Sequence, residues 1–210
     1  MDTQIPERFS ALKQPLFYYQ STGDGDIKDL LEDVKKLDTN IKTANNPLIN
    51  YKYDQFKGAS HYSAVLYSIP NALNQIFNCY KPISMTEFSE KIAILPNGQV
   101  KYLTDKYDAI TNTLGLKVTI RVSDFKAIEA AILKNKSYTE LDKLAELARK
   151  NYPKSMLADY ELGLMYEKNG DTKKAAKAYQ KASQFDEIGD LSKDMMLEKF
   201  DEMQSLTPKK

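Results

Sequence analysis

The chain has 210 residues, 42% of them hydrophobic, and its 30 Lys and Arg residues nearly balance 29 Asp and Glu residues, which leaves a net charge of +1. This length allows one large domain or two small ones, and the near-neutral charge gives no electrostatic case for nucleic acid as a partner. One cysteine (Cys79) and one histidine (His61) exclude an intrachain disulfide and a Cys/His metal site, so we expect no metal and no cofactor.

The sequence shows neither a membrane-spanning segment nor a signal peptide. No apolar run approaches the roughly 20 residues of a membrane-spanning helix, so no membrane span is expected. Met1–Ser10 is too polar for a signal peptide. Because the native N-terminus is not established by the sequence itself, the compartment stays unassigned.

The first part of the chain predicts two strands joined by a helix. Pro15–Gln20 is an apolar, aromatic run that ends in a Gly/Asp turn, and Asn50–Phe56 is a second strand. Between them lies a helix, whose apolar positions are Ile27, Leu30, Leu31, Val34, Leu37 and Ile41. Two strands connected through a helix pair in parallel, and parallel sheets normally contain several strands. This region therefore indicates the end of a larger sheet.

The stretch Tyr51–Tyr80 places the single histidine between the second strand and another helix. A Gly-containing loop, Lys57–Ser60, leads to His61, and an amphipathic helix follows from Ser63, with Pro70 expected to kink or divide it. Its apolar positions predict packing on the sheet: Val65, Leu66, Ile69, Leu73, Ile76, Phe77 and Tyr80. We expect Ser60 to be a loop or cap residue, because a side chain adjacent to His61 cannot readily form an attack geometry.

The rest of the chain has a helical pattern with turn residues between the helices. Leu116–Val122 is β-branched and is expected to be extended. The segment Met156–Ile188 resembles the tetratricopeptide repeat, with a degenerate earlier unit and a capping helix after it. The matching positions are Leu162, Gly163, Tyr166, Gly170, Asp171, Ala175, Tyr179 and Ala182. Such a repeat implies a protein or peptide partner.

The order of these parts resembles the C-terminal portion of serine esterases of the α/β-hydrolase superfamily, the enterochelin-esterase-like group. The likeness is carried by PLFYYQSTGDGD, YKYDQFKGASHYSAVLYSIPNALNQIF, PISMTEFSEKI and the repeat segment. It implies His61 as the general base and Asp26, or else Asp24, as the acid that orients it. No Gly-x-Ser-x-Gly nucleophile motif is present, so the chain alone is predicted to be inactive.

The expected fold is thus an α/β remnant followed by an all-α repeat domain. The expected divisions are 1–80 for the end of the esterase domain, 81–122 for a connector, and 123–210 for the repeats and cap. The expected partners are an acyl-ester substrate in the complete protein, a ligand of the repeats, and a second copy bound through the exposed sheet edge. Three alternatives stay open: a structural His61, Asp26 as a turn or cap residue, and a non-catalytic binding module or scaffold.

Overall fold

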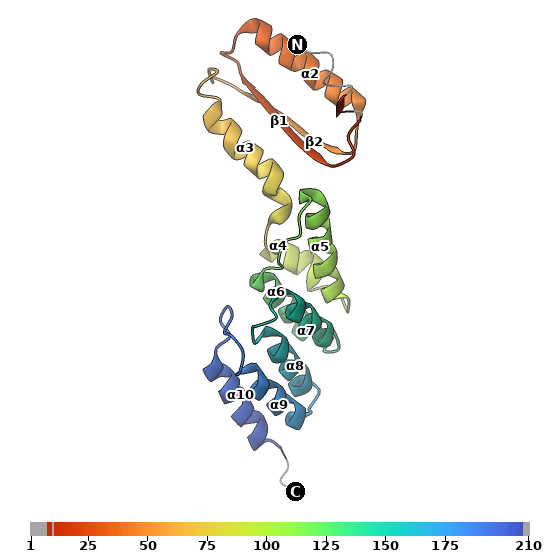
Figure 1. Ribbon diagram of the computed structural model, residues 1–210, viewed down its shortest axis with the longest axis vertical. Coiled ribbons are helices and arrows are strands. Elements are labelled where there is room, and N and C mark those ends of the chain that lie inside the picture. The colour runs from red at the N-terminus through yellow and green to blue at the C-terminus, as the bar shows by residue number, and fades with distance from the viewer. Residues whose placement is uncertain (1–7, 10, 208–210) are drawn as a thin grey trace. The chain divides into compact units, whose positions relative to one another are not determined.

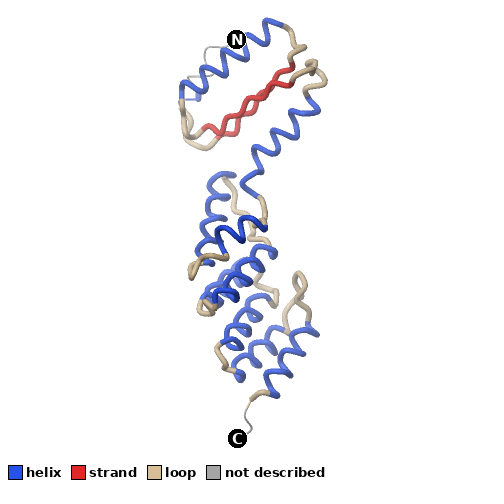
Figure 2. The backbone as a smooth tube through the Cα atoms, turned by 180° about the vertical axis from the view of Figure 1, so that it is seen from behind, coloured by secondary structure: helices blue, strands red, loops and turns tan. Residues whose placement is uncertain are grey.

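The computed structural model describes residues 8–9 and 11–207, which are mostly helical and contain a two-stranded sheet (Figures 1 and 2). The chain divides into two compact units. One contains the residues up to Lys81 together with Ile110–Leu116, and the other contains Pro82–Ala109 and Lys117–Lys210. The fold is therefore mixed, with the sheet in the first unit and most of the helices in the second.

The sheet of the first unit is built from β1 (Leu16–Gly23) and β2 (Ile49–Phe56), joined by α2 (Lys28–Ala44). The strands are parallel and in register over their full lengths, from the pair Leu16–Ile49 to the pair Gly23–Phe56. The parallel pairing predicted from the strand–helix–strand order is confirmed. Because the strands are parallel, the loops that follow them lie at the same edge of the sheet.

The face of the sheet toward α2 carries the apolar core of this unit. Leu37 and Ile41 of α2 are buried with Phe9, and the partly buried rings of Tyr18 and Tyr51 pack against them. The two tyrosine rings stack with centroids 5.9 Å apart. Cross-strand aromatic pairs of this kind stabilise a sheet through contact area and ring geometry, so this face fixes the positions of both strands.

The opposite face of the sheet meets α3 (Val65–Phe77) chiefly through polar side chains. The Ser68 hydroxyl lies 2.6 Å from the Ser21 hydroxyl, and the Asn71 side chain donates to the Asp54 carboxylate at 3.0 Å. Hydrogen bonds thus join α3 to the sheet where we expected apolar packing. The expectation that the apolar side of this helix covers the sheet is wrong.

Most of the apolar side of α3 faces away from the sheet and is exposed; Tyr67 differs, because its ring packs against Phe56 of β2 with centroids 5.2 Å apart. No residue of α3 is buried, and its large apolar side chains are among the most exposed in the molecule, namely Val65, Leu66, Tyr67, Ile69, Leu73 and Phe77. Pro70 lies inside the helix without dividing it, and a short 3-10 turn, Asn78–Tyr80, follows.

The second unit is a succession of helices. These are α4 (Met85–Glu87) with a π turn at Phe88–Ile92, α5 (Gln99–Leu114), α6 (Val122–Asn135), α7 (Glu140–Asn151), α8 (Leu157–Lys168), α9 (Thr172–Ala182) and α10 (Lys193–Ser205). Helices α6 to α10 each pack against the next, and the end of α5, from Ile110, belongs to the first unit. Residues 117–121, expected to be extended, form a loop without strand pairing.

Helices α8 and α9 approach closely at Gly163. A Cβ atom built there would meet the ring of Tyr179, which is itself fully buried between the helices. The missing side chain at Gly163 therefore lets the two helices approach at this position. Close helix packing of this kind is a property of many helical folds and does not identify one family.

Candidate functional site

The loops after β1 and β2 bring Asp26 and His61 together at the carboxyl edge of the sheet. The Nδ1 atom of His61 lies 2.8 Å from Oδ1 of Asp26. The other oxygen of Asp26 accepts the Gly23 backbone N–H at 2.7 Å, so both carboxylate oxygens are engaged. The Asp26 side chain is only 3% exposed, whereas the His61 side chain is 64% exposed. A sheltered carboxylate therefore holds one side of a solvent-facing imidazole.

The two loops meet because glycine lets their backbones touch. The Gly25 N–H donates to the Ala59 carbonyl at 3.0 Å. A Cβ built at Gly23 would overlap this same carbonyl oxygen, so no larger residue fits there without moving a loop. The turn Gly23–Asp26 is therefore held against the second loop before any side chain contributes, which places Asp26 within reach of His61.

Asp24, the other candidate acid, has a different contact. Its side chain accepts the backbone N–H of Gly58 at 2.7 Å, and Gly58 adopts a left-handed φ of 76° that glycine tolerates. Asp24 thus ties the first loop to the second without contacting the imidazole. Of the two aspartates implied by the resemblance, Asp26 contacts His61, whereas Asp24 joins the two loops through its hydrogen bond to Gly58.

The hydrogen bond to Asp26 fixes which imidazole nitrogen is available. An ionised carboxylate can only accept a hydrogen bond, so Nδ1 of His61 must carry the hydrogen and Nε2 carries the lone pair. Within the described residues, Nε2 has no hydrogen-bond partner. The Tyr62 ring packs edge-on against the imidazole, with centroids 5.6 Å apart. Such an arrangement can accept a proton at Nε2 while the carboxylate stabilises the imidazolium.

The hydroxyl groups of Ser60 and Ser63 bond within the turn that precedes α3. The Ser63 hydroxyl accepts the Ser60 N–H at 2.8 Å, and the Ser60 hydroxyl accepts the Ser63 N–H at 3.2 Å. This reciprocal pattern closes the turn that leads into α3, whose N-cap is Ala64 and has no side-chain cap. Ser60 therefore lies in the loop before α3, and no hydroxyl in the described part of the chain is hydrogen-bonded to the imidazole.

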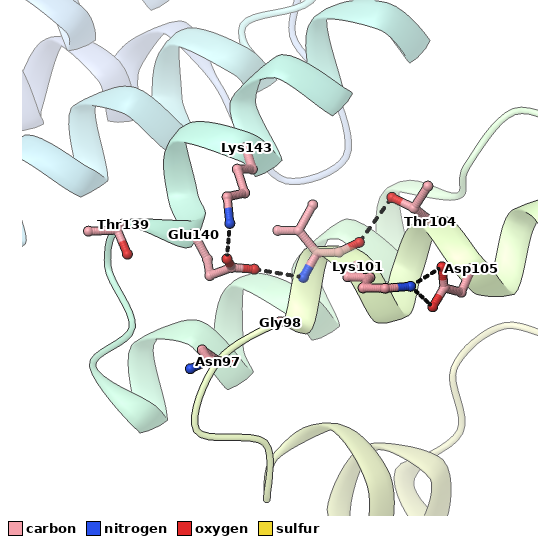
Figure 3. Close-up of a pocket in the computed structure, with 9 residues that line it drawn as sticks. Asn97, Gly98, Lys101, Thr104, Asp105, Thr139, Glu140 and Lys143 are labelled. Atoms are coloured by element: carbon pink, nitrogen blue, oxygen red, sulfur yellow. Dashed lines mark hydrogen bonds and ion pairs between the residues drawn. The ribbon is translucent and has the colours of Figure 1, made fainter.

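A polar pocket of about 630 Å³ lies in the second unit, away from Asp26 and His61, and is drawn in Figure 3. Glu140 is its buried member; it accepts the Val100 backbone N–H at 3.2 Å and pairs with Lys143 at 2.6 Å. Lys101 on the other wall pairs with Asp105 at 2.6 Å. The charges of this pocket are thus satisfied by one another, and Glu140 caps the beginning of α5.

Glu161 of α8 is a buried acid that sequence reasoning missed. It is 0% exposed, and neither carboxylate oxygen has a hydrogen-bond partner among the described residues. Burial, together with the nearby Glu129 carboxyl, raises the pKa of Glu161 well above its usual value. Burial also raises the pKa of Glu129, to which the Tyr160 hydroxyl donates at 3.3 Å. The available signal was a glutamate within the tightly packed segment around Gly163.

The described residues contain no group of three or more His, Cys, Asp or Glu side chains placed to hold a metal ion. Across the same residues, none of the helices combines the length and apolar character required to cross a membrane.

Comparison with known proteins places this fold beside one solved structure. No protein-family model matches the sequence, and no curated protein matches it. The chain is similar to an uncharacterised protein from Capnocytophaga ochracea DSM 7271, with 31% sequence identity and a TM-score of 0.78. The match covers 96% of this chain and 58% of the Capnocytophaga chain, so this chain spans little more than half the length of its structural neighbour.

These findings contradict the assignment to the serine esterases with tetratricopeptide repeats. The described residues are mostly helical and form only a two-stranded parallel sheet, and the matched structure is uncharacterised. No matching family supports either resemblance. The assignment was wrong because short patterns, such as a strand–His–helix order or small residues at helical spacing, arise in unrelated folds wherever the same packing geometry is needed.

Proposed function

We propose that Asp26 and His61 form the acid–base half of a hydrolytic site for acyl esters, in which the attacking hydroxyl comes from a segment outside this chain. The observation that carries the proposal is the 2.8 Å contact between a sheltered carboxylate and a largely exposed imidazole. A carboxylate–imidazole pair of this geometry activates a hydroxyl that is itself a weak nucleophile near neutral pH.

The roles follow from the contacts of each residue. Nε2 of His61 would accept the proton of the hydroxyl as it attacks the ester carbonyl and would later return it to the leaving alcohol. Asp26, oriented by the Gly23 N–H, would hold the imidazole in the required tautomer and stabilise its charged form. The partial coverage of the longer Capnocytophaga chain supports a site completed by further sequence.

The test is hydrolysis of p-nitrophenyl butyrate, measured for this chain and for a protein that contains both the chain and the hydroxyl-bearing segment. The complete site should lose on the order of a thousandfold in kcat with His61→Ala, because general-base catalysis is removed. Asp24→Ala is the matched control, since the Asp24 side chain bonds the Gly58 backbone and not the imidazole, so it should lose far less activity than His61→Ala. An unchanged kcat in His61→Ala would remove the imidazole from the reaction.

A second candidate function, binding of a protein segment by the helical unit, rests on a groove between α9 and α10. Phe200 lies at this groove of about 480 Å³, and Lys173 and Lys177 line it from α9. An acidic peptide with an aromatic residue would complement these groups. A fluorescein-labelled Glu/Phe peptide should bind the chain and lose affinity in K173E/K177E; equal binding to both forms would refute this candidate.

A further inference from the structure

The outward face of α3 and the turn before it, which contains Tyr62, carry an apolar stripe with an unusual order of residues. We define the stripe as the six residues Tyr62, Leu66, Ile69, Pro70, Leu73 and Phe77, all of which are exposed. The five larger members are between 50% and 86% exposed. A helix normally turns such a face toward the interior, but here the polar side of α3 is bonded to the sheet. The apolar stripe therefore faces solvent in the single chain, and we expect another protein surface to bury it.

We propose that the cover is a second copy of this chain, whose α3 lies antiparallel against the first in a twofold dimer. The stripe has the same order of residue types from either end: aromatic, leucine, then a central isoleucine and proline, then leucine and aromatic. The intervals between successive members are also symmetric. Two antiparallel copies would thus place Tyr62 against Phe77 and Leu66 against Leu73, in a self-complementary contact.

The absence of charged residues around the stripe and the area that two stripes would bury both support a second copy of this chain as the partner. From Gly58 to Tyr80 the sequence contains no Lys, Arg, Asp or Glu, so a second copy meets no like-charge repulsion there. Exposed apolar patches above a few hundred Å² mark interaction sites. Two such patches, with two aromatic and three aliphatic side chains each, would bury on the order of 1,000 Å², the lower limit for a specific interface.

The first test is the oligomeric state of the 210-residue chain by sedimentation and light scattering over a range of concentrations. The wild type should have twice the mass of one chain, and L66K/L73K should have the mass of one chain with an unchanged far-UV circular dichroism spectrum. The control L116K/L206K adds the same charge at exposed leucines outside the stripe and should remain dimeric. A monomeric wild type, or a dimer that persists in L66K/L73K, would overturn the proposal.

The second test measures the antiparallel register by disulfide formation in a Cys79→Ala background. Leu66→Cys combined with Leu73→Cys should yield a covalent dimer under oxidation, because positions 66 and 73 face each other across the twofold axis. The two positions lie about 10 Å apart along one helix, too far for a bond within a chain. Leu66→Cys alone should remain monomeric on a denaturing gel, and its cross-linking as fast as the double variant would contradict the register. Neither test depends on the role of His61.

Discussion

The buried carboxyl of Glu161 yields a prediction whose sign and pH range follow from its surroundings. Both of its oxygens lack partners within the described residues, and burial raises its pKa well above 4.5. The unfolded chain ionises this carboxyl above pH 4.5, whereas the folded chain keeps it protonated. The stability associated with the neutral form is complete below pH 4.5 and is lost as the pH rises toward the folded-state pKa.

The substitution Glu161→Gln removes the loss of folding stability that a buried carboxyl causes as the pH rises. This loss grows by about 1.4 kcal/mol per pH unit while only the unfolded state ionises. Relative to wild type, the variant should therefore become progressively more stable as the pH rises from 4.5 to 7. The glutamine amide also lacks partners, which costs about 1–3 kcal/mol at every pH. The change in the stability difference with pH is thus the diagnostic quantity.

Urea unfolding followed by far-UV circular dichroism at several pH values measures this difference. Glu167→Gln on the same helix is the control with the opposite sign. Burial raises the pKa of Glu167, but hydrogen bonds from Lys168, Tyr179 and Lys199 outweigh it and bring the pKa to about 2. Its stabilisation is present above pH 4.5 and is lost as the pH falls toward 2, so Glu167→Gln should destabilise most at pH 7. A stability difference for Glu161→Gln that does not change between pH 4.5 and 7 would refute the reasoning.

Two further predictions concern close packing and the imidazole. Gly163→Ala should cost about 1–3 kcal/mol in urea unfolding, because the added methyl group meets the buried Tyr179 ring; an unchanged midpoint would show that α8 and α9 are less tightly packed. Asp26→Ala should convert His61, at a pH where the ring is neutral, from the Nδ1–H tautomer toward the mixture of free imidazole in ¹⁵N NMR, whereas Asp24→Ala should not. Equal spectra for the two variants would argue against the Asp26 contact.

The parallel sheet and the site loops were predictable from local sequence because both depend on short-range patterns. Two apolar strands flanking an amphipathic helix leave few arrangements other than a parallel pair. The Gly-rich turn ending at Asp26 and the loop before His61 then fall at one sheet edge. The choice between Asp24 and Asp26 required coordinates, because it depends on how the Ala59 carbonyl meets the first loop.

The buried acid and the polar face of the sheet were harder to infer. Glu161 lies in a helix whose sides are nearly all covered, so no amphipathic pattern distinguishes its environment from that of an exposed glutamate. Asp54 and Lys52 have the ordinary appearance of solvent-facing strand residues, yet Asp54 accepts hydrogen bonds from Tyr19 and from Asn71 of α3. Such contacts join segments distant in sequence and leave no local signature.

Helix α3 shows why periodicity alone could not assign its partner. The apolar spacing correctly indicated an amphipathic helix, because spacing reports that one side is apolar. It does not report which surface covers that side. The sheet face beneath α3 already carries Ser21 and Asp54, whose hydrogen bonds to Ser68 and Asn71 would be lost if the helix were turned by half a revolution. Losing these hydrogen bonds would cost about 1 kcal/mol each, so the polar side of α3 turns inward and the apolar stripe is left for another molecule.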